Sequence, residues 1–279
     1  QDNALPIMAY RPAPIQISGI GYTNTTGVDT IDYFLSDEIC IPYGDTTAES
    51  GFTEQILRMP HSHLCYAPEE IRPMPETGFE APVRRNGYVT FGSFNNFAKI
   101  TDEMLTCWSE VLRAVPTARL LLKNVHPRAE TLIRMWQRAE HAGIDLARLE
   151  LRPGSKDYLR DYLDVDIILD TFPYQGGGTT CEALFMGLPV VTLAGNRHGA
   201  RFGASLLANA GLGELVADTA DGYVECAAAL AQDVELLAAL HTAVPRMMRA
   251  SPLMDGGGYV RAVEAAYKMI WERYLNEEA

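Results

Sequence analysis

The fold is decided by residues 165–193, which read VDIILDTFPYQGGGTTCEALFMGLPVVTL. The stretch opens with a continuous apolar run, Val165–Asp170, of the kind that is buried on both faces of a parallel sheet. A glycine-rich loop follows, then a helical segment, Thr179–Met186, and a second apolar run, Pro189–Leu193. Strand, helix and strand in this order predict a βαβ unit.

The same alternation of short apolar runs and longer amphipathic segments extends over the chain from residue 88 onward. The other predicted strands are Tyr88–Phe94, Ala118–Lys123, Arg148–Arg152 and Glu214–Ala217. The other predicted helices are Asp102–Ala114, Pro127–Ala142, Ser155–Leu163, Ala200–Ala210 and Ala220–Gln232. Because right-handed crossovers place helices on both faces of a parallel sheet, we predict an α/β fold with a Rossmann-like, doubly wound sheet.

The two ends of the chain differ from this pattern. Residues 1–82 offer an apolar strand, Ile15–Ile20, a possible second strand, Tyr33–Ser36, and a proline-rich linker, Pro68–Pro82, which is too little for a complete doubly wound domain. The segment Tyr259–Tyr274 has apolar residues near helical spacing. We therefore expect a domain remnant with its linker (1–82), a ligand-binding domain (83–258) and a C-terminal helix that packs back on the domains (259–279).

Composition limits the function classes. The formal net charge of −13 argues against nucleic-acid binding, since phosphate backbones are held by clustered Lys and Arg. No apolar run reaches the roughly 20 residues of a membrane span, and the first residues do not read as a secretory signal, so we expect a cytoplasmic protein with no membrane partner. The five cysteines show no CxxC pair and no zinc-like spacing, so we expect reduced thiols, no bound metal and no cofactor.

Polar and glycine-rich loops follow four of the predicted strands. In open parallel sheets a ligand binds in the crevice at the carboxyl ends of the strands, so these loops are expected to converge on one place. They read FNNFAK (94–99), RPGSKDY (152–158), TFPYQGGGTTCE (171–182) and AGNRHGAR (194–201).

The loop at 171–182 is the strongest single feature. Its glycines, Gly176–Gly178, let the backbone approach a ligand closely, and Thr179 and Thr180 then open a helix whose free amide groups suit phosphate oxygens. It matches neither GxGxxG nor GxxxxGK[ST], so neither a dinucleotide nor a Walker-type triphosphate is indicated. Glu182, expected in the first turn of that helix, either accepts the hydroxyl groups of a ribose or only complements the helix dipole. A flexible glycine turn without a ligand is the alternative for the loop itself.

Single residues of the other loops have two interpretations each. Lys99 either neutralises charge on a departing diphosphate or is an ordinary exposed lysine. Tyr158 either stacks on a base or belongs to the packing. Of the histidines, only His126 and His198 fall on the predicted ligand edge; His198 is the better candidate, with an ordinary loop histidine as its alternative, and no general base is assigned.

Three long motifs occur in order along the chain: RPAPIQISGIGYTNTTG (11–27), GYVTFGSFNNFAKI (87–100) and DTFPYQGGGTTCEALFMGLPVVTL (170–193). Together they resemble the catalytic region of the O-GlcNAc transferase and SPINDLY family, intracellular transferases that modify Ser and Thr of proteins. The resemblance covers about residues 11–274. It implies the two-domain glycosyltransferase B type, with the donor bound between two Rossmann-like domains and only the end of the N-terminal domain present in this chain.

The resemblance also implies residue roles. Lys99 matches the lysine on which activity depends, and it contacts the donor diphosphate together with Asn96. The full donor-binding set comprises Asn96, Lys99, Lys156, Tyr158, Gly177, Gly178, Thr179, Thr180 and Glu182. The residues expected near the donor sugar are Gly21, Tyr22 and Thr23.

Some positions depart from the family pattern. Tyr158 stands where the family usually has the His that stacks on uracil, and Glu182 stands where the animal enzymes have the Asp that holds the ribose. The animal enzymes have His and Thr at the places of Gly177 and Gly178, so backbone amides would replace those side chains here. Thr23 replaces the proline usual near the donor sugar.

By this resemblance the chain is expected to belong to an inverting, metal-independent transferase that moves GlcNAc from UDP-GlcNAc to Ser or Thr hydroxyls of an acceptor protein. Protein O-fucosylation from GDP-fucose is a close alternative, and a nucleotide-sugar-binding remnant without turnover is the alternative from another class. An epimerase would need catalytic carboxylates and a histidine on both domains, and no such set is found. The family's N-terminal catalytic half and tetratricopeptide repeats are expected upstream, since this chain has no repeat of about 34 residues.

Overall fold

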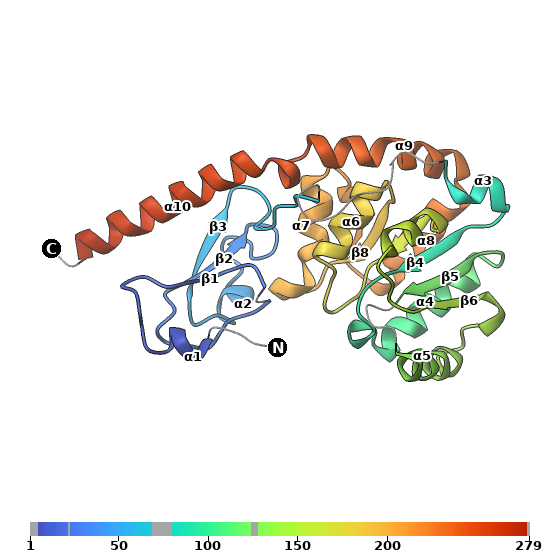
Figure 1. Ribbon diagram of the computed structural model, residues 1–279, viewed down its shortest axis with the longest axis horizontal. Coiled ribbons are helices and arrows are strands. Elements are labelled where there is room, and N and C mark those ends of the chain that lie inside the picture. The colour runs from blue at the N-terminus through green and yellow to red at the C-terminus, as the bar shows by residue number, and fades with distance from the viewer. Residues whose placement is uncertain (1–4, 22, 69–79, 124–127, 278–279) are drawn as a thin grey trace.

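The computed structural model describes residues 5–21, 23–68, 80–123 and 128–277. Two parallel sheets organise these residues, a small one in the first part of the chain and a larger one in the second (Figure 1). The predictions made for Tyr22, for His126 and for most of the proline-rich linker lie outside the described residues.

The larger sheet has six parallel strands in the order β6-β5-β4-β7-β8-β9. Their bounds are β4 Thr90–Ser93, β5 Arg119–Lys123, β6 Leu149–Arg152, β7 Ile167–Leu169, β8 Val190–Leu193 and β9 Val216–Ala217. Counted along the chain, this is the 3-2-1-4-5-6 order of the doubly wound Rossmann fold, which confirms the predicted fold class. The order reverses between the neighbouring strands β4 and β7, so a ligand crevice is expected where these two strands end.

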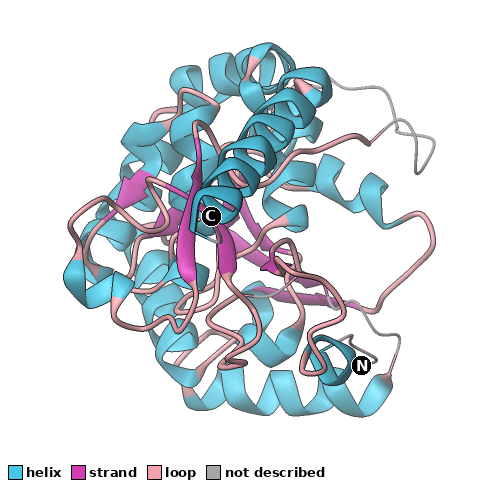
Figure 2. Cartoon of the chain, turned by 90° about the vertical axis from the view of Figure 1, so that its left-hand side faces the viewer, coloured by secondary structure: helices cyan, strands magenta, loops and turns pink. Residues whose placement is uncertain are grey.

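Helices cover both faces of this sheet (Figure 2). Their bounds are α4 Asp102–Ala114, α5 Ala129–His141, α6 Gly178–Met186, α7 Phe202–Asn209, α8 Ala220–Gln232 and α9 Val234–Ala250. Leu120 and Leu122 of β5 pack into a core with residues of α4, α5 and α8, whereas Leu121 packs into a second core with residues of α6, α7 and α9. The strands are continuously apolar because both rows of their side chains are buried.

Short helical segments connect these elements: α3 Pro82–Asn86, η1 Phe97–Lys99, η2 Leu146–Arg148, η3 Tyr158–Asp164, η4 His198–Ala200, η5 Gly213–Leu215 and η6 Pro252–Met254. Among the described residues, a single helix long and apolar enough to cross a membrane is not found. Only the pair α8 and α9 passes that test together, and the two helices meet at a bend of 96°.

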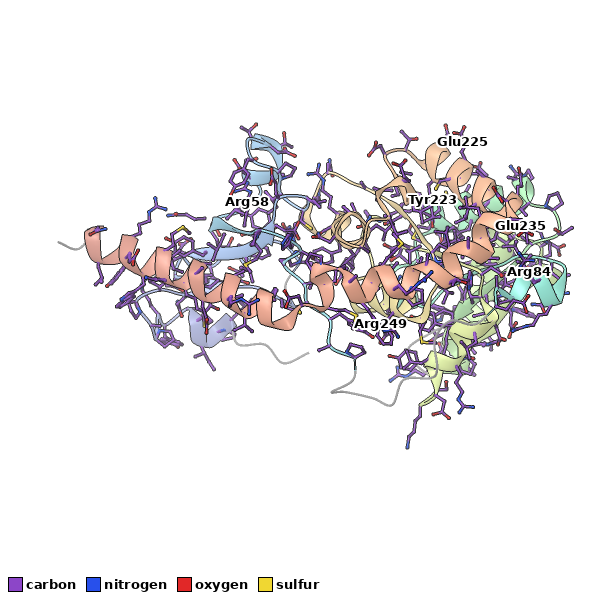
Figure 3. All side chains as sticks on the ribbon, turned by 90° about the horizontal axis from the view of Figure 1, so that it is seen from above. Arg58, Arg84, Tyr223, Glu225, Glu235 and Arg249 are labelled. Carbon is purple, nitrogen blue, oxygen red and sulfur yellow. The ribbon has the colours of Figure 1, made fainter. Side chains whose placement is uncertain are left out.

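The small sheet has three parallel strands in the order β1-β2-β3. Its elements are α1 Leu5–Met8, β1 Ile17–Ser18, β2 Tyr33–Asp37, α2 Thr46–Glu49 and β3 Gln55–Met59. The long helix α10, Gly256–Glu277, extends from the large part of the molecule over β3 (Figure 1), where Leu57 and Met59 share a core with Ile270. Viewed from above, α9 and α10 follow one another along the length of the molecule, and Arg84 of α3 pairs with Glu235 of α9 at the far end with an N–O distance of 2.7 Å (Figure 3).

Several predicted elements differ from the structure. The segment predicted as the helix Ser155–Leu163 is the 3₁₀ helix Tyr158–Asp164, because Lys123 binds Pro153 O and Ser155 Oγ and holds the start of this segment in a loop. The predicted strand Glu214–Ala217 shortens to Val216–Ala217 after the turn η5. The strand β3 and the helix α9 were not predicted; α9 contains Pro245, which interrupts the sequence signal of a helix.

Candidate functional site

A cavity of about 850 Å³ lies at the carboxyl ends of β4, β5 and β7, where the sheet order reverses. This volume is in the range of sites for small organic ligands. The cavity is lined by Phe94, Asn95, Asn96, Lys99, Lys123, Gly154, Ser155, Lys156, Tyr158, Gly177, Gly178, Thr179 and Glu182. Three of the predicted loops, 94–99, 152–158 and 171–182, therefore meet at this one cavity, which we call the pocket.

Lys99 reaches the pocket from η1, the short helix after β4. Its Nζ donates a hydrogen bond to Gln175 O at 2.9 Å, lies 3.4 Å from Asn95 Oδ1 and lies 3.9 Å from the centre of the Tyr174 ring. Burial lowers the pKa of Lys99, while the nearby Asp170 carboxylate acts in the opposite direction. The ammonium group is therefore fixed on the pocket wall by neutral partners, in a place where an anionic ligand would be attracted.

Asp170, the residue that follows β7, anchors the glycine turn. Its Oδ1 accepts the backbone N–H groups of Thr171 and Gly176 at 2.8 Å each, and its Oδ2 accepts the Thr192 hydroxyl at 2.9 Å. Burial raises the pKa of Asp170 to about 6, against the effect of these hydrogen bonds. A Cβ at Gly176 would lie 2.5 Å from Thr179 Oγ1, so the close approach of the turn to α6 requires glycine.

The helix α6 begins at Gly178 and opens onto the pocket, since a Cβ at Gly178 would meet no atom within 4 Å. The Thr179 hydroxyl donates to Asn95 Oδ1 at 3.0 Å and so ties this turn to the loop after β4. Asn96 caps η1 by accepting the Ala98 N–H at 3.0 Å. A helix N-terminus with free N–H groups beside a lysine ammonium is a favourable place for a phosphate or other anion.

Glu182 lines the pocket from α6, one helical turn after the glycine turn. The sequence predicted Glu182 in the first turn of α6. It lies in the second turn instead, because the helix begins at Gly178. Its carboxylate accepts hydrogen bonds from the hydroxyl groups of Tyr158 and Tyr162, the latter at 3.4 Å. Since the dipole effect falls off within the first turn, the interpretation of Glu182 as a dipole partner loses its basis. The Tyr158 and Glu182 side chains form one continuous surface of the pocket.

Three residues of the predicted site set that the structure describes, Gly21, Thr23 and Thr180, do not line the pocket. Thr180 is buried because its position on α6 turns it toward the sheet, and its hydroxyl donates to Gly176 O at 3.1 Å. Gly21 and Thr23 belong to the loop after β1 and lie outside the pocket lining. Tyr22 is outside the described residues.

His198 lies in η4, after β8, and faces the small sheet instead of the pocket. It is 2% exposed, and the Phe34 and Phe202 rings contact it edge-on with centroid distances of 5.0 Å each. Burial lowers the pKa of His198 to about 4, so the ring is neutral near pH 7. A role of His198 in contacting the ligand of the pocket is therefore not supported.

The sequence interpretation missed Asn95 and Lys123. Lys123 is the last residue of β5, and its Nζ lies 2.7 Å from Asp161 Oδ2 and also binds Pro153 O and Ser155 Oγ. It therefore shapes the loop that carries Lys156, whose side chain is exposed at the pocket rim. A lysine that ends an otherwise apolar buried strand was the available signal.

A second group of reactive side chains lies between the two sheets. The potential metal-ligand atoms of Cys40, His63 and His198 are all within 4.8 Å of one another, and the three residues are buried. Sequence spacing gave no indication of this group, because the three residues come from separate loops. Together with Asp37, which contacts His63, we call it the inter-sheet cluster.

Known proteins resemble this chain over nearly all of its length. The model of glycosyl transferase family 41 matches residues 3–71 and 82–263. A probable UDP-N-acetylglucosamine–peptide N-acetylglucosaminyltransferase SPINDLY of Solanum lycopersicum is 42% identical over 99% of this chain and 29% of its own length. The protein of the same description from Oryza sativa subsp. japonica is 42% identical over 100% of this chain and 30% of its own length. The chain thus spans about 30% of the length of these relatives.

Solved structures show the same relationship. A mutant of the Thermobaculum terrenum O-GlcNAc transferase superposes with a TM-score of 0.87 at 36% identity, covering 99% of this chain and 52% of that one. WaaG, a glycosyltransferase involved in lipopolysaccharide biosynthesis, shares the fold with a TM-score of 0.51 at 15% identity, covering 94% of this chain and 80% of its own. Because the family model and relatives with about 42% identity extend over nearly all of its length, the chain belongs to glycosyl transferase family 41.

Proposed function

We propose that this chain is the donor-binding half of a transferase that moves GlcNAc from UDP-GlcNAc to Ser or Thr hydroxyl groups of an acceptor protein. The observation that carries the proposal is the position of the Lys99 ammonium beside the open N-terminus of α6, with Glu182 on the same cavity. Relatives of this chain are named as UDP-N-acetylglucosamine–peptide N-acetylglucosaminyltransferases, which supports the same substrate class. We expect the cytoplasm as the compartment.

In this proposal the diphosphate of the donor occupies the space between Lys99 and the glycine turn. The backbone N–H groups at the start of α6 and the Thr179 hydroxyl act as hydrogen-bond donors to phosphate oxygens. Gly177 and Gly178 line the pocket without side chains, which lets the ligand come close to the backbone. Two unit charges of opposite sign would meet here in a partly buried place, where their attraction is stronger than in bulk water.

The nucleoside is assigned to the wall formed by Tyr158 and Glu182. A carboxylate accepts hydrogen bonds from both hydroxyl groups of a ribose, and the Tyr158 hydroxyl that donates to Glu182 fixes its direction. The Tyr158 ring offers an apolar surface for a base. Because Tyr158 replaces the histidine usual in the family, GDP-fucose is the competing donor, and the identity of the base is an outcome of the test below.

For the transfer step, we propose an inverting, metal-independent displacement in which an acceptor hydroxyl attacks the anomeric carbon. The bond from that carbon to the diphosphate oxygen breaks, UDP leaves with the bonding electrons, and the proton of the acceptor hydroxyl is released to solvent. Negative charge develops on the leaving oxygen, next to the Lys99 ammonium and the start of α6, and this stabilisation is greater in the transition state than in the ground state. Residues outside this chain would supply the acceptor site, since the relatives are about three times as long.

Calorimetric titration with UDP, GDP, UDP-GlcNAc and GDP-fucose tests the donor class. We expect UDP and UDP-GlcNAc to bind with a Kd at least about tenfold below that of GDP and GDP-fucose. The reverse order would assign the fucose donor, and absence of binding for all four compounds would contradict the proposal. Binding of UDP without transfer by the full-length protein would leave the alternative of a binding module without turnover.

A further inference from the structure

The inter-sheet cluster joins three loops that are far apart in the sequence. Cys40 follows β2, His63 follows β3, and His198 lies in η4 after β8 of the larger sheet. Their exposed fractions are 0%, 2% and 2%, and their potential ligand atoms lie within 4.8 Å of one another. A thiol and two imidazoles are the side chains that divalent zinc and related transition ions prefer.

Hydrogen bonds to the imidazole rings fix which nitrogen carries the proton. His63 Nδ1 lies 2.6 Å from Asp37 Oδ2, and His198 Nδ1 lies 3.2 Å from the carbonyl oxygen of Thr23. A carboxylate and a carbonyl oxygen only accept, so Nδ1 is the donor in both neutral rings. Each Nε2 then keeps a free lone pair. A histidine held by a carboxylate or carbonyl through one nitrogen is the usual arrangement of metal-binding histidines.

The environment of His198 Nε2 is a second indication that the cluster binds a ligand. It is buried and has no hydrogen-bond partner among the described residues. The aromatic rings of Phe34, Phe52 and Phe202 lie 5.0, 6.2 and 5.0 Å from this imidazole ring between centroids, so three of its neighbours are apolar rings. Buried polar atoms are nearly always satisfied, and an unpaired imidazole nitrogen next to a thiol and a second imidazole indicates a missing electrophilic partner.

We propose that Cys40, His63 and His198 bind one divalent transition-metal ion, Zn²⁺ in the first place, as a structural link between the two sheets. With Zn–N distances of about 2.0–2.1 Å and a Zn–S distance of about 2.3 Å, tetrahedral ligand atoms lie roughly 3.3–3.7 Å apart, so the side chains close on the ion by about 1 Å. The Cys40 thiol loses one proton to solvent as its sulfur forms the bond to the ion. The thiolate and the Asp37 carboxylate balance the two positive charges, and a water completes the coordination.

The position of the site explains what the ion would do. Cys40 and His63 belong to the small sheet, whereas His198 belongs to the larger one, so the ion fixes the two sheets relative to each other. The residue after His198, Gly199, accepts the Gln175 N–H at 3.1 Å, and Gln175 O accepts from Lys99. His198 is therefore connected to the Lys99 ammonium of the pocket through Gly199 and Gln175.

Metal content tests the proposal without any donor or acceptor, so its result is independent of the proposed transfer. The protein is purified without chelator from zinc-supplemented cultures, and a second sample is refolded with Zn²⁺. We expect about one Zn²⁺ per chain in the wild type and a loss of at least about tenfold in Cys40→Ser and His198→Asn. Cys226→Ser is the matched control, because this half-buried cysteine lies outside the cluster, and it keeps the wild-type content.

Cobalt provides a readout on the wild-type protein if the cluster variants fold poorly, as circular dichroism would reveal. Co²⁺ added to metal-free protein should give an intense tetrahedral visible spectrum with a thiolate charge-transfer band, and binding should release one proton per chain. A wild type with less than about a tenth of an equivalent of zinc after both preparations, together with a six-coordinate cobalt spectrum, would overturn the proposal. Equal zinc in the wild type and in a folded Cys40→Ser variant would also overturn it.

Discussion

The pocket and the inter-sheet cluster are both made of polar residues that follow the ends of parallel strands, yet only one of them is open. In the pocket, Lys99 and the start of α6 face a cavity of about 850 Å³. In the cluster, Asp37 accepts hydrogen bonds from His63, from Ser205 and from backbone amides, and all four cluster residues are at most 2% exposed. Loops at the ends of parallel strands therefore form a ligand site where they leave a cavity. They form the buried inter-sheet cluster where the small sheet packs against them.

The two regions also treat buried charge differently. Burial by itself raises the pKa of Asp37, but the hydrogen bonds from His63 and from backbone amides hold it well below its usual range. Asp170 at the glycine turn accepts hydrogen bonds from backbone amides and the Thr192 hydroxyl but none from an imidazole, and burial raises its pKa to about 6. The Asp37 carboxylate in the cluster is thus surrounded by hydrogen-bond donors of the fold, whereas the Lys99 ammonium in the pocket has the neutral partners Gln175 O and Asn95 Oδ1 and faces the cavity.

The largest effect is expected for the inter-sheet cluster, on the free energy of unfolding. Asp37→Ala removes the acceptor of the His63, Ser205 and Cys40 hydrogen bonds and should lower the free energy of unfolding by about 3–5 kcal/mol, because it leaves several buried donors unpaired. Urea denaturation measures it. Asp29→Ala, at an exposed position of the same region, is the control and should change the value by less than about 0.5 kcal/mol. Equal free energies of unfolding for the two variants would show that the inter-sheet cluster does not stabilise the fold.

The next effect concerns the pocket. Lys99→Ala should reduce kcat for transfer at least about 100-fold, or roughly 2.7 kcal/mol, because the leaving diphosphate loses its cation, while UDP still binds measurably. Turnover and UDP titration are measured in a preparation of the full-length protein that is active for transfer. Arg160→Ala, an exposed residue outside the pocket lining, serves as the control. Unchanged turnover in the Lys99 variant would remove the role assigned to this lysine.

A smaller effect is expected for the nucleoside wall. Glu182→Gln should weaken UDP binding about tenfold, or roughly 1.4 kcal/mol, since a ribose hydroxyl loses a charged acceptor. The same substitution should leave the affinity for 2′,3′-dideoxy-UDP almost unchanged. An equal loss for both nucleotides would mean that Glu182 acts on the pocket structure and not on the ribose.

The smallest effect tests how burial alone changes a carboxyl group. Asp166 precedes β7, accepts the backbone N–H groups of Val83 and Thr90, and burial raises its pKa to about 6. Because the folded state holds this proton more tightly than the unfolded state, the contribution of Asp166 to stability is present below about pH 4 and is lost as the pH rises through 6.

The comparison of wild type with Asp166→Asn isolates this contribution. We call the difference in free energy of unfolding between wild type and variant the stability deficit. It should be roughly 1 kcal/mol larger at pH 5 than at pH 8, because the wild type loses the contribution of the protonated Asp166 carboxyl when this group ionises, whereas the asparagine of the variant does not titrate. Urea denaturation at the two pH values gives the two deficits. A deficit that is the same at both pH values would show that the pKa of Asp166 is not raised.

Much of the larger sheet was accessible from the sequence. Its strands are continuously apolar and helices such as α4 and α5 are amphipathic, so local periodicity predicts element type and order with little help from distant contacts. The pocket side chains of 94–99 and 171–182 were accessible for the same reason, since parallel strands end at one edge. Where local signals were weak, as in β3 and in the proline-containing helix α9, the prediction failed.

The sequence by itself determined that an α/β chain with a glycine-rich turn after one central strand would gather polar loops at one edge. Only the tertiary structure decided which of those residues face a cavity. In it, Thr180 is buried and binds Gly176 O, Lys123 pairs with Asp161 beside the pocket, and His198 is buried against the small sheet. The physical reason is that periodicity along the chain encodes the burial of each element's face, whereas a contact such as that among Cys40, His63 and His198 depends on how two separate sheets pack.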